Sequence, residues 1–257
     1  MELEDKIIAV TGGGNGIGAA MVRRFHREGA RALIVVDLDG EAASRVASDV
    51  NGLAAELDVS QGEDVAALVA RVEQEVGPID VFCSNAGISR VSNLSTPVGD
   101  WQRLWDVNVM SQVHAARAVV PGMIERGGGY LLNTASAAGL LNQIGSAAYG
   151  VTKHAAVGFA EWLALSHAHQ GIKVSVLCPQ AVQTAMIADR ASETLSAAVD
   201  GIMQPEEVAE AVVAGLREES FLILPHPQVR EYMHRKISDY DRWLGGMNRL
   251  QQKLTAK

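Results

Sequence analysis

A tyrosine and a lysine stand four residues apart in the segment Tyr149-Gly150-Val151-Thr152-Lys153. If this segment is helical, the two side chains lie on one face, a single turn apart. A free tyrosine has a pKa near ~10 and is a poor base at neutral pH, but a neighbouring ammonium stabilises the phenolate and lowers that pKa. The pair could therefore act as a general acid and base. An ordinary helical tyrosine followed by a solvated lysine would show the same spacing.

A glycine-rich stretch, Thr11-Gly12-Gly13-Gly14-Asn15-Gly16-Ile17-Gly18, follows a short apolar run near the start of the chain. Glycines let the chain turn tightly and let a pyrophosphate approach the backbone, and the helix that follows offers free N–H groups to phosphate. Its place between a predicted strand and a predicted helix favours a dinucleotide site. The candidate contacts in this turn are Gly12, Asn15, Gly16, Ile17 and Gly18.

Asp37 ends the second predicted strand. A carboxylate there can accept hydrogen bonds from the adenosine ribose, and it repels a 2′-phosphate. Because no Arg or Lys stands in the glycine turn or directly after Asp37, the sequence favours NAD over NADP. Asp37 could instead cap a turn before Asp39-Gly40. Asp58 and Val59, after the third predicted strand, could contact the adenine, and a loop-capping role suits Asp58 nearly as well.

The elements that would position these groups alternate between short β-branched runs and longer stretches of helical periodicity, which is typical of βαβ units. The predicted strands are Lys6–Val10, Ala32–Val36, Leu53–Leu57, Val81–Ser84, Tyr130–Thr134, Lys173–Leu177 and Phe221–Leu224. The predicted helices lie near residues 17–28, 41–50, 62–76, 100–120, 148–169 and 206–217. Right-handed crossovers then give an α/β fold, a Rossmann-type doubly wound seven-stranded parallel sheet with helices on both faces.

No linker, repeat or low-complexity tract interrupts this order, so we expect a single domain over residues 1–257. Residues 184–204 lack a strong pattern and should form a mobile substrate loop. Residues 228–257 should form a helical tail weakened at Gly245–Gly246, with its apolar stripe packed on the core or on a neighbouring subunit. That stripe consists of Met233, Ile237, Tyr240, Leu244, Met247 and Leu254.

Composition excludes several classes of function. The chain has 257 residues, a formal charge of −8 and a pI of about 5.4, so nucleic acid and anionic membranes are poor partners. No apolar stretch is long enough to cross a membrane, and the acidic start lacks a secretion signal, which predicts a cytoplasmic protein. Cys83 and Cys178 are expected to be buried, reduced thiols rather than a disulfide or a metal pair.

With its tyrosine–lysine segment and glycine turn, the chain resembles the short-chain dehydrogenase/reductase family over almost its whole length. The family's Thr-Gly-x-x-x-Gly-x-Gly turn is matched by Thr11, Gly12, Gly16 and Gly18. Its other motifs fall, in order, on Asn85-Ala86-Gly87, Asn108, Ser136, Tyr149, Lys153, Pro179, Val182 and Thr184. The chain departs from the pattern at Ser84, where the family often has Asn, and at Gln180, where it usually has Gly.

The resemblance implies a role for each matched residue. Ser136 would hydrogen-bond the substrate oxygen, and Tyr149 would transfer the proton. Lys153 would hold ribose hydroxyls and lower the pKa of Tyr149. Asn108 would hold a water that links Lys153 to solvent, although a side chain tied to backbone would also suit this position. The further cofactor contacts implied are Asn85, Ala86, Gly87, Pro179, Val182 and Thr184.

The expected function is therefore hydride transfer between NAD(H) and a hydrophobic secondary alcohol or ketone, with no metal. The substrate pocket should be mostly apolar. Its tentative residues are Ala138, Gln143, Gln180 and Met186. Two alternatives stay open, an NADPH-dependent 3-oxoacyl-type ketoreductase and a non-catalytic NAD-binding sensor. The family's habit of pairing through its two long helices implies a homodimer or homotetramer.

Overall fold

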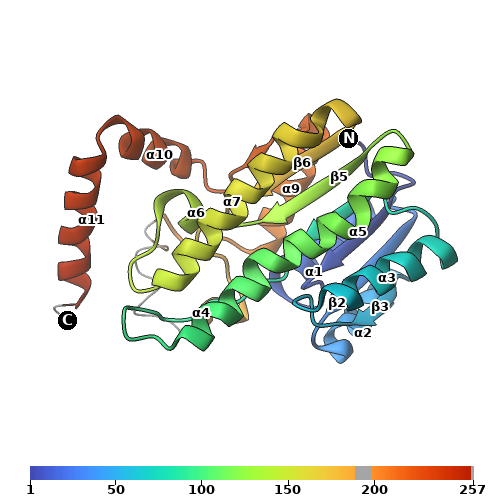
Figure 1. Ribbon diagram of the computed structural model, residues 1–257, viewed down its shortest axis with the longest axis horizontal. Coiled ribbons are helices and arrows are strands. Elements are labelled where there is room, and N and C mark those ends of the chain that lie inside the picture. Colours follow the sequence, from blue (N-terminus) through green and yellow to red (C-terminus); the bar gives the residue numbers. More distant parts are fainter. Residues whose placement is uncertain (189–197, 199, 256–257) are drawn as a thin grey trace.

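The structure, a computed structural model, describes residues 1–188, 198 and 200–255. Its centre is a seven-stranded parallel sheet in the order β3-β2-β1-β4-β5-β6-β7 (Figure 1). The strands are β1 (Ile7–Thr11), β2 (Ala32–Asp37), β3 (Leu53–Glu56), β4 (Val81–Ser84), β5 (Gly129–Thr134), β6 (Ile172–Leu177) and β7 (Leu222–Ile223). The order reverses between β1 and β4, which confirms the predicted doubly wound Rossmann-type fold.

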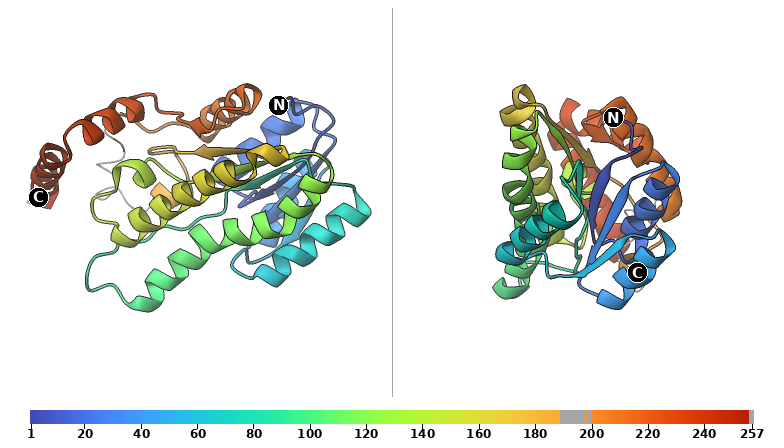
Figure 2. Two further views of the ribbon diagram at one scale, coloured as in Figure 1. Left: turned by 45° about the horizontal axis from the view of Figure 1, so that its top comes forward. Right: turned by 90° about the vertical axis from the view of Figure 1, so that its right-hand side faces the viewer.

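Helices cover both faces of the sheet, as the right-hand view of Figure 2 shows. One face carries α1 (Gly16–Arg27), α2 (Gly40–Asp49) and α9 (Pro205–Glu218). The other carries α3 (Gly62–Glu75), α5 (Ser111–Glu125) and α7 (Ala147–His167). Alternate residues of β1 enter the two cores, Ile8 and Val10 on the first side and Ile7 and Ala9 on the second. Strands buried on both faces are apolar throughout, which is why the sequence runs predicted them.

The helix predicted near 100–120 differs from the expectation in its interior. It consists of α4 (Val98–Trp105), a π-helical turn at Asp106–Met110 and α5, which follow one another without a gap. A π turn inserts one residue into the helical repeat and is common at functional sites. Two short helices were not predicted, α6 (Ala138–Leu141) and α8 (Ala185–Ala188), since four residues carry no periodicity.

The C-terminal tail breaks at a different place from the one predicted. It forms α10 (Gln228–Ser238) and α11 (Tyr240–Thr255), and Gly245–Gly246 lie inside α11. The glycines do not interrupt the helix, and the break falls at Asp239 because a cap decides the boundary. Asp239 has an extended backbone, and its carboxylate accepts a hydrogen bond from the Arg242 N–H at 3.0 Å, as a helix N-cap does. In Figure 1 the tail lies at the end of the molecule farthest from β3.

Other expectations concern single features. Cys83 and Cys178 are both buried and unbridged, as predicted. The predicted loop 184–204 lies partly outside the described residues, at 189–197 and 199. Across the described ranges, no helix is long and apolar enough to cross a membrane, and no three His, Cys, Asp or Glu side chains gather as a metal site would require.

Gly18 permits the close packing of α1 on the turn before it, because a Cβ there would lie 1.9 Å from the Gly12 carbonyl oxygen. Gly18→Ala should destabilise the protein by about 1 to 3 kcal/mol, measured by urea denaturation without cofactor. Gly158→Ala is the matched control, since a Cβ there meets nothing within 4 Å. It should be neutral or stabilising by up to about 1 kcal/mol. Equal unfolding free energies for the two variants would contradict this account of Gly18.

Candidate active site

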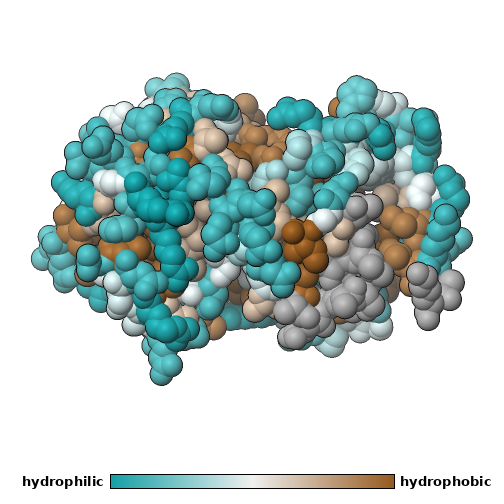
Figure 3. All heavy atoms as spheres, turned by 180° about the vertical axis from the view of Figure 1, so that it is seen from behind, coloured by the Kyte–Doolittle hydropathy of each residue, from teal (hydrophilic) through white to brown (hydrophobic). Residues whose placement is uncertain are grey.

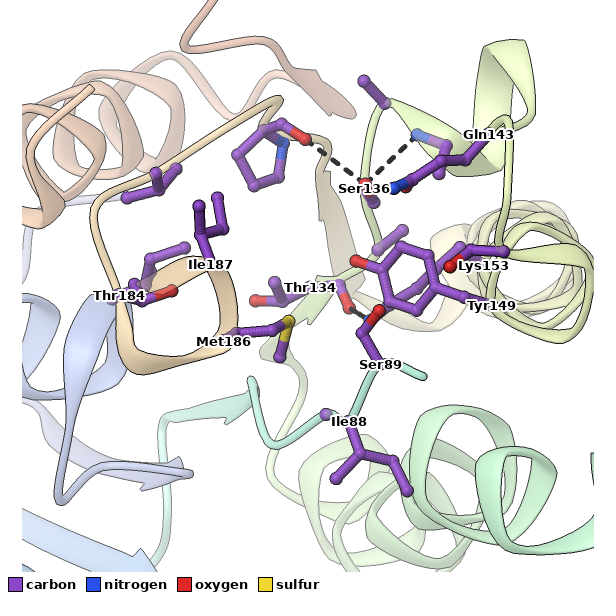
Figure 4. Close-up of a pocket in the computed structure, with 18 of the residues that line it drawn as sticks. Ile88, Ser89, Thr134, Ser136, Gln143, Tyr149, Lys153, Thr184, Met186 and Ile187 are labelled. Carbon is purple, nitrogen blue, oxygen red and sulfur yellow. Dashed lines mark hydrogen bonds between the residues drawn. The ribbon is translucent and has the colours of Figure 1, made fainter. Parts of the chain in front are cut away.

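A cavity of about 720 Å³ opens at the carboxyl ends of the strands. This is the crevice at which doubly wound sheets bind ligands. Gly12, Gly16 and Asp37 line one part of it, and Ser136 and Tyr149 line another. Figure 4 shows Ser136, Tyr149 and Lys153 on one side of the cavity, with Thr184, Met186 and Ile187 across from them.

Most of the predicted site residues converge on this cavity, although they are spread along much of the chain. Those in its wall are Gly12, Asn15, Gly16, Ile17, Asp37, Asp58, Val59, Asn85, Ala86, Gly87, Ser136, Ala138, Gln143, Tyr149, Lys153, Pro179, Gln180, Val182, Thr184 and Met186. Gly18 and Asn108 lie outside the wall. Gly18 packs α1 against the turn, and the position of Asn108 is described below.

The glycine turn has the form that an anion site requires. Gly12 and Gly16 adopt positive φ angles of 62° and 51°, which glycine tolerates without strain. A Cβ on Gly12 would lie 2.9 Å from the Ala86 Cα. Helix α1 begins at Gly16, its N-cap Asn15 makes no side-chain capping bond, and its first turn contains no acidic residue. The backbone N–H groups of that turn are thus suited to bind a phosphate.

Thr11 joins the turn after β1 to the turn after β4. Its Oγ1 accepts hydrogen bonds from the backbone N–H of Asn85 at 3.0 Å and of Ala86 at 3.1 Å. The Asn85 side-chain amide donates in return to the Thr11 carbonyl at 3.1 Å. Neighbouring strands therefore hold the two cavity-lining turns together.

Asp37 presents its carboxylate to the cavity from the end of β2. One oxygen accepts from the Gly14 N–H at 2.9 Å and the other from the Asp39 N–H at 3.1 Å. The turn-forming role that the sequence left open for Asp37 is therefore present, since it accepts from the N–H two residues on. The N-cap of α2 is Asp39, whose carboxylate accepts from the Ala42 N–H. Asp37 thus has a fixed orientation in the cavity wall.

Asp58 has the loop-capping contacts that the sequence allowed, although it also lines the cavity. Its carboxylate accepts from the Ser60 N–H and hydroxyl and pairs with Arg103 at 3.2 Å. Burial alone would raise the pKa of Asp58, but the bonds from Ser60 and the charge of Arg103 lower it on balance. Arg103 was not predicted, because it lies on α4 outside the motifs that the sequence shows and reaches the cavity only through the fold.

Tyr149 and Lys153 lie one turn apart at the start of α7. The Lys153 Nζ is 5.6 Å from the centre of the Tyr149 ring and donates to the Thr134 carbonyl at 3.1 Å. In Figure 4 the Tyr149 hydroxyl points into the cavity. Lys153 is only 3% exposed, and burial lowers the pKa of its ammonium to about 8. At neutral pH the lysine is still a cation, held where little solvent screens it from the tyrosine.

Ser136 lies two residues beyond the end of β5 and lines the cavity. Its Oγ accepts from the Ala138 N–H at 3.1 Å and donates to the Pro179 carbonyl over a long 3.4 Å (Figure 4). The strong contact fixes the position of the oxygen. The weak one leaves the hydroxyl proton available for a better acceptor.

Asn108 is fully buried in the π-helical turn, behind the cavity wall. Its side chain accepts from the Ile88 N–H at 2.9 Å and donates to the Ile88 carbonyl at 2.9 Å and to the Thr152 hydroxyl at 3.1 Å. These bonds fasten the segment after β4 to α7, next to Lys153. The backbone tie that the sequence left open is therefore present, and the water-holding role stays a prediction.

The tail contributes wall residues that the sequence did not reveal. Tyr232 and Arg235 of α10 line the cavity, together with Trp243, Met247 and Leu250 of α11. We expected the apolar stripe of the tail to pack on the core or on another subunit. An amphipathic pattern shows that a helix has an apolar face, but not which surface that face meets.

The sheet and the cavity at its carboxyl edge define a Rossmann-type fold with a ligand crevice. The chain belongs to the short-chain dehydrogenase family, whose sequences match residues 6–195, and it is thus an oxidoreductase. It is 34% identical over 227 residues to the meso-2,3-butanediol dehydrogenase of Serratia marcescens, covering 84% of this chain and 88% of that one. It is 36% identical over 193 residues to the 3beta-hydroxysteroid dehydrogenase 2 of Eggerthella lenta, covering 71% and 73%. The structure of a short-chain dehydrogenase/reductase from Burkholderia phymatum in complex with NAD matches with a TM-score of 0.85 at 27% identity, covering 93% and 96%.

The buried ammonium of Lys153 should give the protein a distinctive pH dependence of stability. Its pKa is about 8 when folded and about 10.4 when unfolded, so between these values the unfolded chain binds more protons. Raising the pH through this window therefore favours the folded state, by about 2 kcal/mol between pH 7.5 and 10. The comparison is with Lys153→Met, by urea denaturation without cofactor at each pH. If the difference between wild type and variant did not change with pH, Lys153 would not be a desolvated cation.

Proposed function

We propose that the protein is an NAD(H)-dependent dehydrogenase that interconverts a secondary alcohol and its ketone, with Tyr149 as general acid and base. The observation that carries the proposal is the placement of Tyr149. Its hydroxyl points into a cavity that also contains the glycine turn and Asp37, and the buried Lys153 cation lies beside its ring.

The cavity has the groups that a dinucleotide requires. The N-terminal turn of α1 would bind the pyrophosphate of NAD. Asp37 would bind the ribose attached to adenine, and Lys153 would bind the ribose attached to nicotinamide. Val182 and Thr184 would contact the nicotinamide. NAD⁺ supplies a carbon that accepts hydride, and the protein supplies position and charge. The NAD complex of the related Burkholderia phymatum protein supports the same cofactor here.

The proton chemistry falls to this chain's own residues. Ser136 would turn its weakly bound hydroxyl proton from the Pro179 carbonyl to the substrate oxygen and stabilise the charge that develops there. Tyr149, as phenolate, would remove the hydroxyl proton of the alcohol as the carbinol carbon loses hydride. In the reverse direction the phenol returns that proton to the reduced carbonyl. Lys153 stabilises the phenolate throughout because its charge lies close by in a poorly solvated site.

The alternatives left open by the sequence have less support. An NADPH-dependent ketoreductase needs a cation for the 2′-phosphate. Within the described cavity wall the cation on the Asp58 side is Arg103, which is already paired with that carboxylate. A non-catalytic sensor leaves the meeting of Ser136, Tyr149 and Lys153 at one open cavity without explanation.

We also propose that the protein forms a homodimer or homotetramer through its long helices, and that it acts in the cytoplasm. Helix α7 exposes Val151, Trp162 and Leu165 to 48%, 54% and 84%. Apolar side chains at that level on one helix indicate a surface that association would cover. Two buried, unbridged cysteines suit a reducing compartment.

Tyr149→Phe tests the proton transfer directly. Removing the hydroxyl should lower kcat by about three orders of magnitude for alcohol oxidation followed as NADH absorbance. The affinity for NAD⁺, measured by calorimetry, should stay within about twofold because the ring remains. Tyr240→Phe, an exposed tyrosine on α11, is the matched control and should keep normal turnover. Normal turnover in Tyr149→Phe would remove this residue from the mechanism.

Asp37→Asn tests the cofactor preference. The amide oxygen can still accept the hydrogen bond from the Gly14 N–H, so the turn should survive while the charge is lost. The ratio of kcat/KM for NAD⁺ to that for NADP⁺ should fall by about tenfold or more. Asp39→Asn removes a charge two residues away and should leave this ratio nearly unchanged. Equal ratios in the two variants would show that Asp37 does not select the cofactor.

A further inference from the structure

The C-terminal tail forms a wall of the cavity on its substrate side. Trp243, Met247 and Leu250 lie three or four residues apart on α11, so they share one helix face, and all three line the cavity. Figure 3 views the molecule from behind, with the tail at the right. Apolar surface is exposed at that end, with hydrophilic atoms along its outer edge.

Contacts with α6 fix the position of this wall relative to the catalytic serine. Val229 of α10 is fully buried in a cluster with Ala137 and Leu141. The Lys236 ammonium, 9% exposed, donates to the Leu140 carbonyl at 2.6 Å. Because these partners follow Ser136 directly in the chain, α10 is tied to the segment that holds the substrate oxygen. Trp243 packs on the same cluster and carries α11 into place.

Only part of the apolar stripe of α11 lies in the cavity wall. Leu244 is 56% exposed and lies outside that wall, whereas Met247 lines the cavity and is half-buried. Helix α11 has 16 residues and contains Gly245–Gly246, and glycine has a low helix propensity, so its stability depends on contacts along its apolar face. An apolar molecule bound between Tyr149 and this face would cover Met247 and Leu250 and stabilise the helix.

The charge of the wall argues for an uncharged occupant. Arg235 lines the cavity, but its guanidinium is paired with Glu231 one turn away and packs over the Tyr232 ring at 5.7 Å. Its positive charge is therefore balanced within α10. The remaining tail residues in the wall are aromatic or aliphatic.

We propose that the α10–α11 tail is the specificity-determining wall of the site, and that the substrate is an uncharged secondary alcohol or ketone whose apolar body extends from Tyr149 to Met247 and Leu250. This inference rests on the proposed function and deepens it. It predicts that alcohols too short to reach α11 are poor substrates, because they leave the apolar face uncovered.

The first test is the chain-length dependence of the wild-type protein. With NAD⁺ in excess, KM should fall by roughly two- to fourfold for each methylene added between butan-2-ol and decan-2-ol. The anion 9-hydroxydecanoate has the same carbon chain as decan-2-ol and places a carboxylate near α11. Its kcat/KM should be at least about tenfold lower than that of decan-2-ol, because the carboxylate would lose its hydrating water next to an apolar wall without gaining a partner.

The second test compares two glutamine variants of one helix. Met247→Gln places an amide in the wall, and Leu244→Gln places the same group at a more exposed position of α11 that does not line the cavity. The ratio of kcat/KM for decan-2-ol to that for butan-2-ol should fall about tenfold in Met247→Gln and stay within about twofold of wild type in Leu244→Gln. Glutamine is a good helix former, so both variants should fold alike.

The outcomes separate this inference from the function on which it rests. Three results would contradict the proposal that the tail determines specificity. They are KM values that do not change with chain length, a preference for 9-hydroxydecanoate over decan-2-ol, and equal kcat/KM ratios in the two glutamine variants. The dehydrogenase proposal would survive each of these results as long as butan-2-ol is oxidised in a Tyr149-dependent way. If the wild-type protein oxidised no alcohol with either NAD⁺ or NADP⁺, both proposals would fail together.

Discussion

The ammonium of Lys153 lies in surroundings that disfavour a charge. It is 3% exposed, it donates to the Thr134 carbonyl, and burial brings its pKa down to about 8. A desolvated cation of this kind strongly stabilises an anion that forms nearby, because little water screens the attraction. Tyr149, which lines the cavity, can become such an anion, and its ring centre is 5.6 Å from the Lys153 Nζ. In the proposed mechanism, the unfavourable burial of Lys153 is thus what makes Tyr149 chemically useful.

The arrangement depends on rigid elements rather than on loops. Strand β5 ends at Thr134, whose carbonyl accepts hydrogen bonds from the side chains of Lys153 and Gln112. Ser136 follows two residues later. A single strand end therefore orients the cation and also places the serine. Asn108 completes the frame from behind by joining the segment after β4 to α7. Displacement of any of these elements would move Ser136, Tyr149 and Lys153 relative to one another, and well-packed elements resist such displacement.

The sequence predicted the parts of this structure that local patterns encode. Strands buried on both faces are continuous apolar runs, so β1, β2, β4, β5 and β6 fall within a residue or two of the expected bounds, and helical spacing alone placed Tyr149 beside Lys153. The tail shows which features such local patterns do not predict. A capping aspartate at position 239 outweighs two glycines in setting the helix break, although both signals were visible in the sequence. The packing of α10 on α6 depends on contacts such as the hydrogen bond from Lys236 to the Leu140 carbonyl. These two residues are 96 positions apart, so no local sequence pattern predicts their contact.

The proposed mechanism assigns chemistry and selectivity to different kinds of structure. Ser136, Tyr149 and Lys153 lie on a strand end and a long helix that pack in the second core, whereas the proposed wall consists of α10 and α11, which contact the rest of the site through α6. Because α6 begins two residues after Ser136, its contacts with α10 tie the tail to the residue proposed to bind the substrate oxygen. On this proposal, substitutions on the cavity-facing side of α11 change which alcohol fits and leave Tyr149 and Lys153 undisturbed. The same reaction could then act on substrates of different length, since only the depth of the apolar wall would have to change.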